Sequence, residues 1–96
     1  MIELRKTPEF DRWINGLRDL RARLKIHTRI RQLMAGNLGD HKSIGEGVWE
    51  LRIHYGPGYR VYYTKKGDEW ILLLAGGDKD SQAIDIRNAL KLARKS

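Results

Sequence analysis

The alternation of apolar and polar residues in the segment 47–64 predicts a β-hairpin. Aromatic and β-branched residues flank Gly56-Pro57-Gly58, which is a turn signal because proline cannot extend a strand ladder and glycine tolerates positive φ. Pairing of Tyr55 with Tyr59 sorts the side chains onto two faces by the two-residue period of a strand. The apolar face carries Trp49, Leu51, Ile53, Tyr55, Tyr59, Val61 and Tyr63. The polar face carries Glu50, Arg52, His54, Arg60, Tyr62 and Thr64.

The polar face of this hairpin gathers cations. Its predicted cross-strand pairs are His54 with Arg60 and Arg52 with Tyr62. Neighbouring cations repel each other unless an anion lies between or above them. Two interpretations follow: a solvated sheet face on which Glu50 neutralises Arg52, or a binding site for an anion such as phosphate.

The N-terminal part of the chain predicts a strand followed by two helices. Residues 1–6 alternate as in a short edge strand. Thr7 is a helix N-cap with Pro8 at the first helical position, and Asn15-Gly16 kinks or ends that helix. A second helix is expected over 19–36, where a glycine supplies the stop.

This second helix is predicted to be amphipathic. Its expected buried stripe consists of Leu20, Leu24, His27, Ile30 and Met34, widened by Ile26 and Leu33. On that stripe His27 is expected to be a packed core residue rather than a catalyst. The opposite row is basic and consists of Arg18, Arg21, Lys25 and Arg29. This row is either a solvated helix face or a row of phosphate contacts, which add affinity without sequence preference.

The rest of the chain predicts a loop, the hairpin, a further strand and a last helix. The segment 36–47 is rich in glycine but lacks the spacing of a phosphate-binding loop. Residues 69–76 form a continuous apolar run, typical of a strand buried on both sides. The last helix starts at Asp80 or Ser81. Its expected buried stripe is Ala83, Ile86, Leu90 and Ala93, with Arg87, Lys91 and Arg94 on another face.

These elements predict one α+β domain over 1–96 in the order βααβββα. The expected sheet is small and mainly antiparallel. Its helices are expected to pack on the apolar face of the hairpin, which leaves the basic face open. That open face, with Lys79 at its rim, is the expected functional surface.

Composition narrows the possible functions. The net charge of +7 favours a polyanionic partner, either nucleic acid or an acidic protein. A membrane partner is not expected, because no helix pairs its basic face with a protruding Trp/Phe face. The chain has no cysteine, which excludes disulfides and thiolate metal sites. Three dispersed histidines without a His-Glu-x-x-His motif form no recognised zinc site, and no cofactor is expected. No apolar run is long enough for a membrane span or a signal peptide, so a cytoplasmic location is expected.

The remaining chemistry is metal-free cleavage of RNA, which carries its own nucleophile in the 2′-hydroxyl. An enzyme then positions the chain, moves protons and stabilises charge on the reacting phosphate. Arg52, Arg60 and Lys79 are candidates for charge stabilisation, because arginine is suited to bidentate phosphate contacts. His54 or Tyr62 is a candidate for proton transfer, and Tyr62 is alternatively a stacking partner for a base. Contacts to RNA are further expected from Arg18, Arg21, Lys25, Arg29, Lys42 and Arg87.

Several motifs resemble the RelE/ParE superfamily of bacterial toxins, in its HigB-like addiction module killer branch. They are Gly36-Asn37, Gly39-Asp40, Glu50-Leu51-Arg52-Ile53, Gly56-Pro57-Gly58-Tyr59-Arg60-Val61-Tyr62, Gly76-Gly77-Asp78-Lys79, Gln82 and Asp85-Ile86. The resemblance covers nearly the whole chain. It implies a type II toxin that inhibits translation by cutting mRNA on the ribosome and causes growth arrest.

The resemblance also implies roles for individual residues. Arg60 matches the arginine of the Tyr-Arg-x-x-Tyr strand, a RelE catalytic group, and Lys79 matches the basic residue of the end motif. Arg52 and Glu50 fall on a pair of strand lysines. The last-helix tyrosine of RelE aligns with Asp85, so that the general base is expected among Asp85, His54 and Glu50.

The implied partners are a helix-turn-helix (HigA-like) antitoxin from the same operon, the ribosome and mRNA, with operator DNA reached only through the antitoxin. Two alternatives stay open. One is a ParE-like, non-catalytic inhibitor of DNA gyrase. The other is an inactive toxin that acts as a corepressor with its antitoxin.

Overall fold

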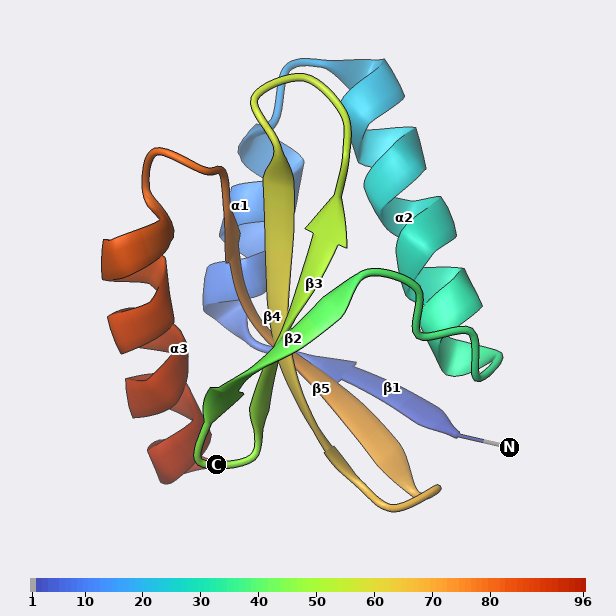
Figure 1. Ribbon diagram of the computed structural model, residues 1–96, viewed down its shortest axis with the longest axis vertical. Coiled ribbons are helices and arrows are strands. Elements are labelled where there is room, and N and C mark those ends of the chain that lie inside the picture. Colours follow the sequence, from blue (N-terminus) through green and yellow to red (C-terminus); the bar gives the residue numbers. More distant parts are fainter. Residues whose placement is uncertain (1) are drawn as a thin grey trace.

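The computed structural model describes residues 2–96, which form a five-stranded sheet and three helices (Figure 1). The strands are β1 (Glu3–Lys6), β2 (His41–Gly45), β3 (Val48–Ile53), β4 (Tyr59–Lys66) and β5 (Trp70–Gly77). The helices are α1 (Pro8–Gly16), α2 (Leu20–Met34) and α3 (Gln82–Lys95). The strand order is β1-β5-β4-β3-β2, and β1 pairs with β5 in parallel while the other neighbours are antiparallel. The predicted α+β class with a mainly antiparallel sheet is confirmed.

Helices cover both faces of the sheet: α1 and α2 lie on one face and α3 on the other (Figure 1). Ile71 and Leu73 of β5 join the core with α1 and α2, whereas Leu74 packs with Ala89 of α3. The prediction that one face stays open is therefore wrong. The cause is β5 itself, because an uninterrupted apolar strand requires cover on both sides.

The β3–β4 hairpin forms with the predicted faces but in a different register. Ile53 pairs with Tyr59, so the predicted pairing of Tyr55 with Tyr59 is wrong by two residues. The turn is longer than predicted. A slip of two residues leaves each side chain on its predicted face, since the strand period is two. It also places Arg52 directly opposite Arg60.

The segment predicted as a glycine-rich loop contains the additional edge strand β2. It pairs antiparallel with β3 and carries a bulge between Ser43 and Gly45. The imidazole of His41 lies 5.1 Å from the Trp49 ring, centre to centre. Glycine-rich composition concealed this strand because β2 is only partly buried and lacks an apolar alternation.

The helix boundaries follow the predicted caps. The Thr7 hydroxyl accepts a hydrogen bond from Phe10 N at 3.0 Å, and α1 ends at Gly16. The first strand was predicted over 1–6; β1 accounts for it, and Met1 lies outside the described residues. None of the helices within 2–96 is long and apolar enough to cross a membrane.

The buried stripe of α2 differs from the predicted one. It consists of Ala22, Ile26, Ile30 and Leu33. Leu20 and Leu24 are each 68% exposed, and His27 is exposed rather than packed in the core. Both stripes have helical spacing, and the small Ala22 side chain allows the helix to approach the sheet closely. In α3, likewise, Ala89 is buried and Ala83 is exposed.

Candidate active site

Glu50 is the polar centre of the site and is fully buried. Its Oε1 accepts a hydrogen bond from Arg52 Nε at 2.8 Å, and its Oε2 accepts from Gln82 Nε2 at 2.8 Å and from the Tyr62 hydroxyl at 3.3 Å. Arg60 Nε lies 3.4 Å from Oε2, which is an ion-pair distance without hydrogen-bond geometry. One buried carboxylate therefore offsets the repulsion between two opposed guanidiniums.

The two arginines line a cleft of about 450 Å³ at the β3–β4 loop, together with His54 and Lys79. Arg60 Nη1 also donates to the Gly58 carbonyl oxygen at 3.1 Å. Gly58 has a φ of +83°, and a Cβ atom there would touch both Arg60 and Lys79. Four of the predicted catalytic residues thus meet in one place. Guanidinium and ammonium groups at this density are suited to a phosphate group.

His54 and Asp40 form a side-chain pair at the edge of this cleft. The Asp40 carboxylate lies 2.5 Å from His54 Nε2, so Nε2 carries the proton and Nδ1 is the free ring nitrogen. The hydrogen bond from His54 is the main cause that lowers the pKa of Asp40. The backbone N–H of Arg52 donates to the Asp40 carbonyl oxygen at 2.9 Å, which attaches the loop before β2 to β3.

A second cleft, of about 820 Å³, runs along α2. It shares lining residues with the first cleft, namely Arg52, Ile53, His54 and Tyr55. Arg21, Lys25 and Arg29 line its helical side. The Lys25 ammonium lies 5.2 Å from the centre of the Tyr55 ring, a cation–π distance. The predicted basic row of α2 therefore leads toward the arginine pair.

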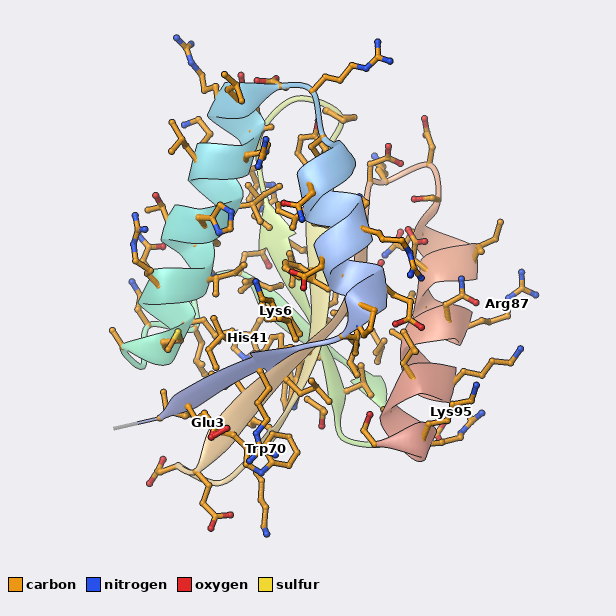
Figure 2. The ribbon with its side chains drawn as sticks, turned by 180° about the vertical axis from the view of Figure 1, so that it is seen from behind. Glu3, Lys6, His41, Trp70, Arg87 and Lys95 are labelled. Carbon is orange, nitrogen blue, oxygen red and sulfur yellow. The ribbon has the colours of Figure 1, made fainter. Side chains whose placement is uncertain are left out.

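Other residues predicted to contact RNA lie elsewhere. Arg18 is exposed before α2, and Lys42 is exposed on the edge strand β2; neither lines the two clefts. Arg87 points outward from α3, away from the sheet (Figure 2). Arg18 and Arg87 were predicted on helix faces and Lys42 in a loop, but local patterns could not indicate which side of the molecule each residue occupies.

Tyr62 and Asp85, which were predicted to be catalytic, do not line the arginine cleft. Tyr62 is fully buried, and burial raises the pKa of its phenol well above the ordinary value. The prediction that it stacks on a base or exchanges protons with substrate is therefore wrong. Glu50 is equally inaccessible and is excluded as the general base.

Asp85 lies on α3 and lines a separate cleft of about 320 Å³ together with Glu9 and Lys91. Burial raises the pKa of Asp85, and a hydrogen bond from the Ser81 hydroxyl at 2.5 Å opposes this shift. It does not line the arginine cleft. Of the three predicted bases, only His54 lines the arginine cleft.

Sequence reasoning assigned no role to Asp40 or Gln82 in this site. Asp40 stands in a loop, and only folding brings it to His54, fourteen positions along the chain. Gln82 is the first residue of α3, and its amide reaches Glu50 across the sheet face. The available signal was Glu50, an acidic residue between apolar neighbours on a predicted strand. A buried carboxylate requires polar partners, and Gln82 is one of them.

Fold and site define a small α+β protein with a basic cleft at the β3–β4 loop. The chain belongs to the family described as phage derived protein Gp49-like (DUF891), whose model matches residues 3–96. This is a toxin–antitoxin-associated RelE-like family, and membership in it implies an antitoxin partner.

Two relatives illustrate the similarity. A protein of Haemophilus influenzae, described only as an uncharacterized protein, is 46% identical over 93 residues, which is 97% of this chain and 94% of the relative. The solution structure of the conserved hypothetical protein HP0894 from Helicobacter pylori has a TM-score of 0.49 and 22% identity. The match covers 83% of this chain and 97% of that one.

Proposed function

We propose that this chain is the toxin of a type II toxin–antitoxin module and acts as a ribosome-dependent mRNA endonuclease of the HigB-like branch. One observation carries the proposal: buried Glu50 holds Arg52 and Arg60 side by side in a cleft that also contains His54 and Lys79. Glu50 offsets only one of the two positive charges of this pair, so the arginines together with Lys79 keep a net positive charge that suits an anionic ligand.

The proposed reaction is attack of the RNA 2′-oxygen on the adjacent phosphorus, with cleavage of the bond to the 5′-oxygen. The products are a 2′,3′-cyclic phosphate and a 5′-hydroxyl. Arg52 and Arg60 stabilise the negative charge that accumulates on the phosphate in the transition state. The free Nδ1 of His54 accepts the 2′ proton, while Asp40 fixes the orientation of the ring. Lys79 is the remaining donor for the leaving 5′-oxygen.

The cleft along α2 extends this site toward a longer polyanion. Arg21, Lys25 and Arg29 contribute contacts that bind phosphates without reading the base sequence. Such contacts suit mRNA and ribosomal RNA alike. Codon choice is then made by pairing on the ribosome and by the shape of the arginine cleft. The proposed partners are the ribosome, mRNA and a helix-turn-helix antitoxin, with operator DNA reached through the antitoxin.

Primer extension on mRNA from a cell-free translation mixture tests this function. Purified protein is added to the mixture and, separately, to the same mRNA without ribosomes. We expect cuts within codons only when ribosomes are present. Intact mRNA together with inhibited DNA supercoiling by purified gyrase would reject the proposal in favour of a gyrase inhibitor.

A further inference from the structure

Helix α2 carries a second apolar stripe that the fold leaves uncovered. Leu20 and Leu24 are each 68% exposed, the largest exposed fractions among the large hydrophobic side chains within 2–96. His27, on the same side, is exposed as well. The core uses another side of the helix, where Ala22 and Ile26 are fully buried.

The two leucines form one continuous surface. Residues four apart lie about 40° from each other around a helix and roughly 6 Å apart along it. Leu20 and Leu24 therefore stand side by side and point nearly opposite to Ala22, which faces the sheet. Isolated exposed leucines are common on protein surfaces, but an adjacent pair outside the core stripe is typical of a docking face.

The surroundings of this pair are strongly basic. Between Leu20 and Met34 the helix carries Arg21, Arg23, Lys25, Arg29 and Arg31 and no carboxylate. Asp19, just before the helix, is occupied as the N-cap and accepts from the backbone N–H groups of Arg21 and Ala22. On the helical wheel Arg21 and Arg23 therefore flank the two leucines on either side, and Arg31 lies in line with them two turns beyond Leu24.

We propose that this outer face of α2 is the docking surface for an acidic amphipathic helix of the antitoxin. Leucine-rich turns of the partner would cover Leu20 and Leu24, and its flanking carboxylates would meet the surrounding cations. The proposal rests on the antitoxin partnership of the family and not on RNA cleavage. A second copy of this chain is unsuited to the face, because each copy carries a net charge of +7.

RNA accounts for the cations of α2 but not for its leucines, since phosphate contacts gain nothing from exposed aliphatic side chains. The docking face and the α2 cleft meet at Leu24, which also lines that cleft. The antitoxin segment therefore binds beside the path proposed for RNA, while the arginine pair itself stays uncovered. The two surfaces can be tested separately for this reason.

Isothermal titration calorimetry of the full chain with the purified product of the adjacent antitoxin reading frame tests the proposal. Leu20→Asn/Leu24→Asn is the test variant, and Ile84→Asn is its matched control, because Ile84 is 57% exposed on α3. We expect the double variant to bind at least tenfold more weakly, since burying one leucine is worth about 1.5–3 kcal/mol and 1.4 kcal/mol is tenfold in Kd. The control should bind like the wild type.

A second variant guards against an effect on folding. Arg31→Glu reverses a charge in line with the leucines without altering either of them and should also weaken binding, more strongly at low salt. Thermal unfolding of each variant should match the wild type.

Unchanged affinity of the double variant, or no binding by the wild type, would overturn the proposal. If the double variant lost mRNA cleavage but kept full antitoxin affinity, the proposal would also be overturned, because the leucine face would then serve ribosome binding. Absence of cleavage by the wild type would reject the endonuclease function and leave the affinity comparison valid.

Discussion

At the scale of single residues, the site depends on Glu50. It accepts hydrogen bonds from three elements: Arg52 on β3, Tyr62 on β4 and Gln82 on α3. These bonds fix the carboxylate in the sheet interior, where its charge balances the arginines without reaching the cleft. Glu50 is therefore a positioning residue, and the arginines are the groups that meet the ligand.

Glu50→Gln should lower the free energy of unfolding by about 3 kcal/mol and disorder the arginine pair. The reason is that the substitution leaves a neutral amide between two guanidiniums, and breaking a buried ion pair typically costs about 3–5 kcal/mol. Urea unfolding measures the change. Glu46→Gln is the control, because Glu46 forms an exposed, solvent-screened ion pair with Arg94 and should change the stability far less. Equal effects of both substitutions would contradict this role for Glu50.

At the scale of elements, helix α1 packs very closely against strand β5. A Cβ atom on Gly76 would lie 2.1 Å from Cε3 of Trp13. The Trp13 ring has little freedom to move, since it packs against Phe10 and Tyr59 with ring centres 5.8 and 6.3 Å away. This close approach of helix and strand positions the end of β5, from which Lys79 follows.

Gly76→Ala should therefore destabilise the protein by about 2 kcal/mol, within the usual cost of overpacking. Thermal unfolding provides the measurement. Gly16→Ala, at the end of α1 where no atom lies within 4 Å of the added methyl group, should leave the midpoint nearly unchanged. A Gly76→Ala protein as stable as the Gly16→Ala protein would show that α1 does not pack as described.

The attachment of α3 has a pH-dependent component at Asp85. Burial raises its folded-state pKa above the unfolded value, so protonation favours the folded state. The stability that Asp85 contributes is complete below its unfolded pKa and is lost as pH rises through the folded pKa. Compared with Asp85→Asn, the wild type should lose free energy of unfolding as the pH rises above about 4, the unfolded pKa of an aspartate. A difference that is constant with pH would refute the raised pKa.

Local patterns predicted most of these elements but not how the faces are covered. Thr7, Pro8 and Gly16 act within a few residues, which is why α1 was predicted with its cap. The rotation of α2 and the cover provided by α3 depend on contacts between distant segments. The same limit applies to the site: strand period placed Arg52 and Arg60 on one face, whereas the contact of His54 with Asp40 required the fold.

At the scale of the whole molecule, the net charge of +7 is distributed unevenly. The two connected clefts gather cations from α2, from the β3–β4 hairpin and, with Lys79, from the segment between β5 and α3. Arg87 and Lys95 point outward from α3 (Figure 2). The cations that line the connected clefts attract a polyanion to them.

Lys25→Gln should weaken binding of a single-stranded RNA and reduce the salt slope, −dlogK/dlog[salt], by about 0.7, the value for one lost phosphate contact. Arg87→Gln removes the same charge on the far side of α3 and should leave the slope unchanged. Fluorescence anisotropy over a series of salt concentrations gives both values. Equal slopes for the two variants would indicate that binding follows net charge rather than the α2 cleft.

The most direct test of the arginine cleft compares Arg60→Ala with Arg87→Ala in a translating cell-free extract, with mRNA cuts followed by primer extension. Both substitutions remove one cation, but only Arg60 lines the cleft beside Glu50. We predict that Arg60→Ala lowers the cleavage rate by at least about 100-fold, the usual loss for a charge-stabilising group, while Arg87→Ala cuts like the wild type. A folded Arg60→Ala protein that cuts mRNA at the wild-type rate would contradict the account.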